Sequence, residues 1–455
     1  MSTLMKINVK IILYLCAVSG LFLLSQHCNG SALTVTKPVE ENSVDEIIDD
    51  NDQYIRENPK MDPATEETGS LKINYRKYPF IKRKLNSIEF NGADWSELRD
   101  LFAHAGDTVV SIVHIGDSHL QSEGSTQRVR SLLQKRYGSA GRGLIVPFKL
   151  AGTNQPSDYL IQSGSSFTSS RIQRKPWSAG MGFTGIALKP RNKTFDFTIS
   201  MRRSEGSEPD FDIVKMFCGG KLPRLISVKA DGTQVGFTQT PKADTLEIFL
   251  HEPAEMVDMH FSSGGDCSVY GFQLQNQMAG IEYSAIGNNG ASMQSYLGYG
   301  KMGQGLQTLR PALVIISLGS NEAFGDVDES LCYQQIDQMV NDIKRYNPQA
   351  QILLTTPGEC QRSTVSYTGT GKNKKAVRSY GPNTQCETVR NIILRYGKEH
   401  NVATWDWWNV AGGRGCSVQW LETGLLQGDR IHNTWDGYHL QGNLLYEALV
   451  KAVEK

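Results

Sequence analysis

The sequence predicts an α/β protein in which a three-layer α/β/α domain is interrupted by an inserted antiparallel β-sandwich. Apolar strands alternate with amphipathic helices in two separate stretches of the chain, which is typical of a parallel sheet with helices on both faces. Between these stretches, short strands of alternating polarity follow one another without a helix, as in a sandwich. The length of 455 residues, with 39% hydrophobic residues, is enough for more than one core.

The N-terminus, residues 1–32, is predicted to be a secretory signal peptide. Lys6 and Lys10 precede an apolar run over 11–24, and small and polar residues follow. This is the order of the charged region, apolar region and cleavage site of such signals. The apolar run is shorter than the ~20 residues of a membrane span. Cleavage and secretion are therefore favoured over an uncleaved anchor or a lipid on Cys28, and membrane contact is expected only in those two alternatives.

Residues 33–80 are predicted to be an acidic, flexible linker. The stretch is poor in large apolar residues and rich in acids, such as Glu40, Asp49 and Glu66. A segment of this composition buries too little apolar surface to offset the entropy of ordering it. Over the whole chain, however, 47 basic residues balance 47 acidic ones. A nucleic-acid-binding protein would be expected to carry a basic excess, so we expect no nucleic-acid partner.

Residues 81–157 are predicted to form the first part of the α/β domain. Apolar residues at helical spacing, from Trp95 to Phe102, predict a helix over 94–104. The β-branched run 108–115 has the length and composition of a buried parallel strand. A second helix is expected to follow, with Val129, Leu132, Leu133 and Tyr137 in it.

Residues 158–280 are predicted to be the inserted sandwich, with strands that include 194–199, 225–228 and 246–250. Residues 281–455 then resume the alternation of strands and helices. Strands are expected at 281–286, 312–318, 351–356 and 402–405, and helices at 328–346, 384–400 and from 435 onward.

Three of the predicted parallel strands are followed by residues suited to acyl transfer. The strand ending at Ile115 leads into Gly-Asp-Ser118, the next into Gly290, and the third into Gly-Ser-Asn321. The carboxyl ends of parallel strands share one edge of the sheet, where sites in such folds are built. Ser118 is therefore the candidate nucleophile. The amides of Ser118 and Gly290 and the side-chain amide of Asn321 are the candidate donors to an oxyanion.

These blocks resemble those of the SGNH, or GDSL-type, hydrolases, which have Gly-Asp-Ser, a central Gly, Gly-x-Asn and a final Asp-x-x-His. The final block has two matches here, Asp429-x-x-His432 and Asp436-x-x-His439. We favour the first, because His432 precedes the last helix, whose expected cap is Thr434, and so lies on a loop able to reach Ser118. Asp436 and His439 are then expected on the helix surface.

The resemblance implies a flavodoxin-like α/β/α hydrolase domain and a carboxylic ester hydrolase without metal or organic cofactor. His432 would act as general base and Asp429 would orient it. Among such enzymes, an insertion between the Ser and Gly blocks most resembles that of bacterial O-acetylpeptidoglycan esterases, which carry a sandwich like a carbohydrate-binding module there. The resemblance therefore implies an acetylated glycan as substrate, and the periplasm or cell surface of a bacterium as location. The alternatives are a sugar O-acetyltransferase with the same site and a non-catalytic glycan-binding protein; the oligomeric state is left open.

Six cysteines lie beyond the N-terminal segment, an even number in an exported protein, and their spacing suggests no zinc site. We hypothesise that Cys218 bonds to Cys267 and that Cys360 bonds to Cys386, at the base of a polar segment expected to be a loop. Cys332 and Cys416 would pair or stay free.

Two further features are interpreted as structural. Trp405, Trp407 and Trp408 are expected in the core rather than in sugar binding. Lys372, Lys374 and Lys375 are expected in a solvated loop rather than in a binding patch.

Overall fold

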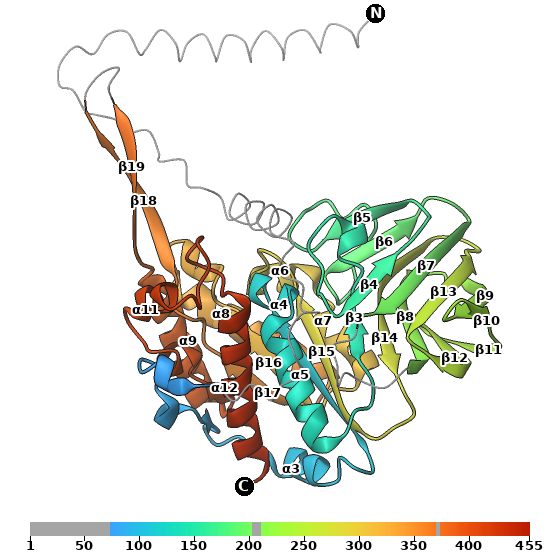
Figure 1. The fold of residues 1–455 in the computed structure, drawn as a ribbon, viewed down its shortest axis with the longest axis horizontal. Coiled ribbons are helices and arrows are strands. Elements are labelled where there is room, and N and C mark those ends of the chain that lie inside the picture. Colours follow the sequence, from blue (N-terminus) through green and yellow to red (C-terminus); the bar gives the residue numbers. More distant parts are fainter. Residues whose placement is uncertain (1–72, 203–210, 370–373) are drawn as a thin grey trace, which may run out of the picture. The chain divides into compact units, whose positions relative to one another are not determined.

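The computed structural model describes residues 73–202, 211–369 and 374–455 (Figure 1). The predicted signal peptide and the predicted linker up to residue 72 lie outside these ranges. The linker's last residues, 73–80, pack on the domain: the Tyr75 hydroxyl donates to Glu447 of the C-terminal helix at 2.9 Å. No helix in the described ranges has both the length and the apolar character needed to cross a membrane.

A six-stranded sheet forms the centre of the α/β domain. Its order is β1–β20–β17–β16–β2–β15, and all neighbouring strands are parallel except β1 and β20. The strands are β1 (Ile88–Glu89), β2 (Val109–Gly116), β15 (Gly280–Gly287), β16 (Leu313–Ser317), β17 (Gln351–Thr355) and β20 (Ala403–Trp405). Because the parallel strands end at one edge, the segments after β2, β15 and β16 lie together.

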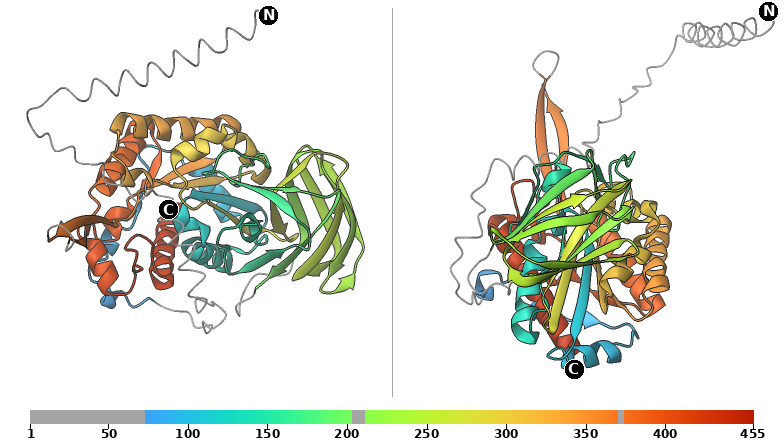
Figure 2. Two further views of the ribbon diagram at one scale, coloured as in Figure 1. Left: turned by 90° about the horizontal axis from the view of Figure 1, so that it is seen from above. Right: turned by 90° about the vertical axis from the view of Figure 1, so that its right-hand side faces the viewer.

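Helices cover both faces of this sheet, as the apolar alternation predicts (Figure 2). One core contains residues of α3 (Ser96–Ala103), α5 (Gly124–Tyr137) and α12 (Trp435–Val453). The other contains residues of α6 (Met293–Tyr299), α7 (Met302–Leu306), α8 (Glu329–Tyr346) and α9 (Gln385–His400). The shorter helices are α4 (Ser118–Gln121), α10 (Trp407–Val410), α11 (Cys416–Glu422) and the 3-10 turns η3 (Tyr75–Lys77), η4 (Arg83–Leu85), η5 (Lys149–Ala151), η6 (Gln307–Leu309) and η7 (Glu322–Phe324).

The insertion consists of two antiparallel sheets. One has five strands: β10 (Thr233–Gln234), β9 (Arg224–Ala230), β13 (Met256–Ser262), β7 (Thr194–Met201) and β4 (Tyr159–Gln162). The other has seven: β11 (Phe237–Lys242), β12 (Thr245–Ala254), β8 (Phe211–Gly220), β14 (Cys267–Gln275), β6 (Ile186–Pro190), β5 (Phe167–Arg171) and β3 (Gly143–Ile145). Strand β3 precedes the predicted start of the insertion yet pairs with β14, so the sandwich takes in part of the first hydrolase segment.

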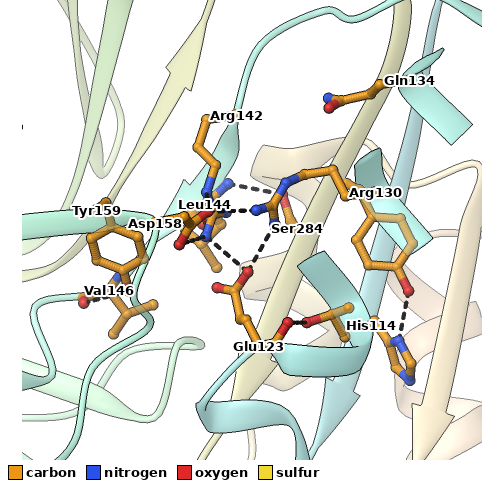
Figure 3. Close-up of polar contacts among 12 residues, drawn as sticks. His114, Glu123, Arg130, Gln134, Arg142, Leu144, Val146, Asp158, Tyr159 and Ser284 are labelled. Atoms are coloured by element: carbon orange, nitrogen blue, oxygen red, sulfur yellow. Dashed lines mark hydrogen bonds and ion pairs between the residues drawn. The ribbon is translucent and has the colours of Figure 1, made fainter. Parts of the chain in front are cut away.

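A buried group of four charges joins the insertion to the α/β domain (Figure 3). Glu123 precedes α5, Arg130 lies within α5, and Arg142 and Asp158 lie where the chain enters the sandwich. Each guanidinium pairs with both carboxylates, and all four side chains are at most 9% exposed. The charges balance, which is the condition under which buried ions are tolerated. We call these four residues the buried ion cluster.

Residues 361–382 differ from the expected loop. They form a hairpin of β18 (Gln361–Thr368) and β19 (Lys375–Pro382), which projects from the α/β domain (Figure 1). The predicted cysteine pairs are present as thiols: Cys360 and Cys386 have their sulfurs 3.6 Å apart, and the neighbouring Cys267 raises the pKa of the Cys218 thiol. Cys332 and Cys416 are also free thiols. The disulfide bonds therefore stay a prediction.

Candidate active site

Ser118 lies at the first position of α4, immediately past strand β2. Asp117 caps this short helix by accepting a hydrogen bond from the His119 amide at 3.0 Å. The helix packs closely against the end of β15: a Cβ on Gly287 would lie only 2.4 Å from the Gln121 backbone nitrogen. The Gly at the end of β15 therefore allows α4 to hold Ser118 at the edge of the sheet.

The structure brings Ser118, His432 and Asp429 into one hydrogen-bonded chain. The Ser118 Oγ lies 2.8 Å from His432 Nε2, and His432 Nδ1 lies 2.7 Å from Asp429 Oδ2. An ionised carboxylate only accepts, so Asp429 holds the ring proton on Nδ1 and leaves Nε2 free to accept from Ser118. This is the arrangement of a nucleophile, a general base and a group that orients the base.

The loop that carries His432 is tightly folded. Asp429 Oδ1 accepts from the amides of Ile431 and His432 at 2.9 and 3.0 Å. Arg430 has a positive φ of 64°, an unusual conformation for a residue with a side chain. The loop therefore fixes the carboxylate and the imidazole relative to each other by backbone contacts as well as by their own hydrogen bond.

The pKa values of this pair shift in opposite directions. Burial by itself would lower the pKa of His432, but the charge and hydrogen bond of Asp429 outweigh it and raise this pKa. Burial would raise the pKa of Asp429, but the charge of His432 and the hydrogen bonds it accepts lower it. The imidazolium formed during proton transfer is therefore stabilised where it arises.

Two backbone amides next to the nucleophile are available for an oxyanion. Within the described residues, neither the Ser118 amide nor the Gly290 amide donates to a protein acceptor. Ser118 begins a helix, where amides have no helical partner. Gly290 follows β15 with a φ of +69°, a conformation that favours glycine. Both positions agree with the predicted donor roles.

Asn321 lies at the start of η7, but its side chain makes no capping hydrogen bond there. Its Nδ2 donates to the Ala291 carbonyl at 2.9 Å and to Asp117 Oδ2 at 3.3 Å. The amide thus points to the loop after β15 and to the residue before the nucleophile. Burial, with the nearby charge of Glu322, raises the pKa of Asp117 to about 7.

The second Asp-x-x-His match is not part of this chain of contacts. Asp436 is exposed in the first turn of α12, and His439 lies within α12 with its ring 4.6 Å from that of Trp435. The Ser118 hydroxyl contacts His432 instead. Trp405, Trp407 and Trp408 are at most 7% exposed, which confirms their interpretation as core residues.

The sequence reasoning missed the contacts of His119. Its Nδ1 lies 3.1 Å from the Tyr438 hydroxyl, and its ring centre lies 5.1 Å from that of His432. Burial, with the charge of His432, lowers its pKa to about 3, so this second imidazole is neutral at ordinary pH. The signal available in the sequence was its place directly after Ser118.

A pocket lies beside the nucleophile helix and the His432 loop. It is lined by Asp117 and His119 beside the nucleophile, by Ile431 and Asn433 of the His432 loop, and by residues 355–360. In the described ranges, no three His, Cys, Asp or Glu side chains are grouped as metal ligands.

Comparison with known proteins agrees with this geometry. Residues 257–440 match the model of the GDSL-like lipase/acylhydrolase family. The matched range holds Gly290, Asn321, Asp429 and His432, whereas Ser118 lies on the far side of the insertion. No curated protein sequence matches the chain.

Solved structures were also compared. A peptidoglycan O-acetylesterase has a TM-score of 0.65 and 21% identity, over 81% of this chain and 99% of that one. A lipase/acylhydrolase from Enterococcus faecalis has a TM-score of 0.27 and 18% identity, over 38% and 77%. A family two carbohydrate esterase from Cellvibrio japonicus has a TM-score of 0.28 and 9% identity, over 65% and 98%. The first of these confirms the predicted fold of the chain, a three-layer α/β/α domain with an additional β-rich region.

Proposed function

We propose that this chain, with its SGNH-type hydrolase domain, is a secreted serine esterase that removes O-acetyl groups from a carbohydrate. The observation that carries the proposal is the contact chain Ser118–His432–Asp429, set beside two available amides at one edge of the sheet. The fold alone would not identify the chemistry, because one fold hosts many functions. The site has the groups that ester cleavage requires.

The contacts of the site support the following reaction. His432 Nε2 takes the proton of Ser118 as Oγ attacks the ester carbonyl carbon, and Asp429 stabilises the imidazolium. The tetrahedral oxyanion accepts from the Ser118 and Gly290 amides. It also accepts a hydrogen bond from the Asn321 N–H that now donates to Asp117, the longer of that amide's two contacts. His432 then protonates the leaving sugar alkoxide, and a water activated by the same imidazole releases acetate from Ser118.

The substrate proposal is an acetylated glycan, with O-acetylated peptidoglycan as the first polymer to test. It is supported by the likeness of the fold to a solved peptidoglycan O-acetylesterase and by the β-sandwich inserted beside the site. Secretion is supported by the N-terminal order of Lys6, Lys10 and the apolar run 11–24. Acetyl transfer to a sugar would use the same groups but requires that water be kept out of the site, so the reaction product distinguishes transfer from hydrolysis.

Acetate release from O-acetylated peptidoglycan tests the proposal, with 4-nitrophenyl acetate as a small ester. We expect turnover of both by the wild-type protein and none by a folded Ser118→Ala variant. The matched control is Ser320→Ala, which removes a hydroxyl from a residue that lines the neighbouring pocket and leaves the triad unchanged. Turnover by Ser118→Ala at the wild-type rate would refute the nucleophile. Acetate release from the small ester alone would refute the substrate, and an acetylated acceptor sugar as main product would indicate transfer.

A further inference from the structure

The hairpin β18–β19 begins at the wall of the pocket that lies beside the nucleophile helix and the His432 loop. Cys360, the residue before β18, lines the pocket together with Ile431 of the His432 loop. The Gln361 amide donates to the Arg430 carbonyl at 3.0 Å, and Arg430 Nη1 donates to Gln361 Oε1 at 2.9 Å. The base of the hairpin is therefore bound directly to the loop that holds the catalytic imidazole.

The hairpin itself lacks a covering partner in the described part of the chain. Its two strands form a separate sheet and pair only with each other. Val365, Tyr367, Val377 and Tyr380 are 37–61% exposed. A two-stranded hairpin with exposed apolar side chains is only marginally stable in water, and such surface commonly marks a binding site.

The two faces of the hairpin differ in character. Since side chains alternate along a strand, the register Val365↔Arg378 places Val365, Tyr367, Arg378 and Tyr380 on one face, which we call the tyrosine face. Lys374 lies over the Tyr367 ring at 4.3 Å, and Arg430 lies over the Tyr380 ring at 3.9 Å. Rings and cations therefore alternate from the catalytic loop outward. The opposite face carries hydroxyl groups with Lys375 and Val377.

The charge of the hairpin is one-sided. No Asp or Glu occurs between residues 361 and 386. Arg362 is engaged at the base, where it donates to the Phe324 carbonyl. Lys374, Lys375 and Arg378 form no ion pair within the described residues and are exposed. Cations held in this way attract carboxylates, and tyrosine rings offer flat apolar surface with a polar edge.

We propose that the tyrosine face binds an acidic glycan strand and leads its acetyl ester to Ser118. This inference rests on the proposed function and adds the class of substrate: a polymer whose sugars carry carboxylates. The rings would pack on the sugar faces, and Lys374 and Arg378 would pair with the carboxylates. The occupant is assigned from two observations, the positive charge of the hairpin without counter-charge and the continuity of this face with the His432 loop through Arg430. Binding along the hairpin would position the ester and so raise kcat/KM for the polymer.

The test compares two double variants on opposite faces, each with one exposed apolar side chain truncated to Ala and one cation reversed to Glu. Tyr367→Ala with Arg378→Glu alters the tyrosine face, and Val377→Ala with Lys375→Glu alters the other face. Both leave the triad and its loop intact. In a Ser118→Ala background, binding is measured to de-O-acetylated peptidoglycan glycan strands freed of stem peptides, which expose carboxylates. Chitohexaose serves as the neutral control ligand. In the Ser118-containing proteins, kcat/KM is measured for the acetylated polymer and for 4-nitrophenyl acetate.

We expect the tyrosine-face variant to lose at least about tenfold in affinity for the acidic strands and in kcat/KM for the polymer, with unchanged turnover of the small ester. The opposite-face variant should lose less than about twofold, and chitohexaose should bind weakly to all variants. Equal losses on both faces, or no loss, would overturn the proposal. The proposal would also be overturned if the tyrosine-face variant kept its affinity for the glycan but lost binding to phosphatidylglycerol vesicles. Loss of a dimer in light scattering, with unchanged glycan affinity, would overturn it in the same way. Failure of the wild-type protein to release acetate from any polymer would instead refute the proposed function, because strand binding is measured without turnover.

Discussion

Removing one charge from the buried ion cluster should destabilise the protein far more than removing a surface charge. In Asp158→Asn the cluster changes from two positive and two negative charges to a net charge of +1. The carboxylate accepts from Arg130 Nη2, from Arg142 Nε at 2.8 Å and from Arg142 Nη2 at 3.3 Å. Breaking a buried pair in this way costs about 3–5 kcal/mol, because a buried charge is left uncompensated. That is a large share of the ~5–15 kcal/mol by which a domain is stable.

Urea unfolding, followed by tryptophan fluorescence, measures this loss as a lower midpoint. The matched control is Glu454→Gln, which breaks the exposed pair with Arg136 and should cost at most about 1 kcal/mol. A second variant, Asp158→Asn with Arg142→Gln, restores balance by leaving the Glu123–Arg130 pair. It should be less destabilised than the sum of its two single variants. A loss below about 1 kcal/mol in Asp158→Asn, or strict additivity in the double variant, would refute the reasoning.

The same cluster predicts a dependence on pH. Burial would raise the pKa of Asp158, but the charges of Arg142 and Arg130 outweigh burial and lower it. A lowered pKa in the folded state contributes stability above the unfolded value of ~3.9, and this contribution disappears as pH falls through the folded value. As pH falls, the free energy of unfolding of the wild-type protein should therefore approach that of Asp158→Asn.

Three further predictions concern the site and its surroundings. Asn321→Ala should lower kcat by ~10²–10³, as expected for the loss of one oxyanion donor; a change in KM alone would contradict that role. His432→Ala should abolish turnover, while His439→Ala should retain it. Because the pKa of His432 is raised above its usual 6.5, kcat/KM should fall as pH decreases through that pKa. A rate that stays flat from pH 8 to pH 4 would exclude a histidine base. Peptide mapping of the protein from an oxidising compartment should recover Cys360 bonded to Cys386, and alkylation of both thiols would refute that bond.

The elements with strong periodicity could be predicted from the sequence. The run 108–115 and the helix expected over 328–346 appear as β2 and α8, each within a residue at both ends. A strand buried on both faces has a continuous apolar sequence, and a helix buried on one side has apolar residues at a period of 3.6 residues. The shared carboxyl edge of the parallel strands predicted that Ser118, Gly290 and Asn321 lie together. The contact of Ser118 with His432 was expected instead from the Asp-x-x-His resemblance and from the loop before the last helix.

Other features depend on contacts that leave no local pattern. The segment 361–382 has few large apolar residues and was expected to be a loop, yet its two strands satisfy each other's backbone groups in an exposed hairpin. Strand β3 has three residues, and its place in the sandwich depends on pairing with β14, over a hundred residues away. The contact of Asn321 with Asp117 likewise requires the tertiary structure.

The insertion is also part of the active site's support. Gln121, at the end of the nucleophile helix, donates through Nε2 to the Asn154 side chain at 2.6 Å, just before the sandwich begins. Its Oε1 accepts from the Asn289 amide at 2.6 Å, and Asn289 Nδ2 donates to Asn154 at 2.6 Å. Because Asn289 precedes Gly290, these three residues connect the nucleophile helix, the entry to the sandwich and the loop with the candidate oxyanion amide. Strand β3 and the buried ion cluster strengthen the same junction. The sandwich is therefore bonded into the framework that positions Ser118, and any role it has in holding a glycan is exerted from a fixed position.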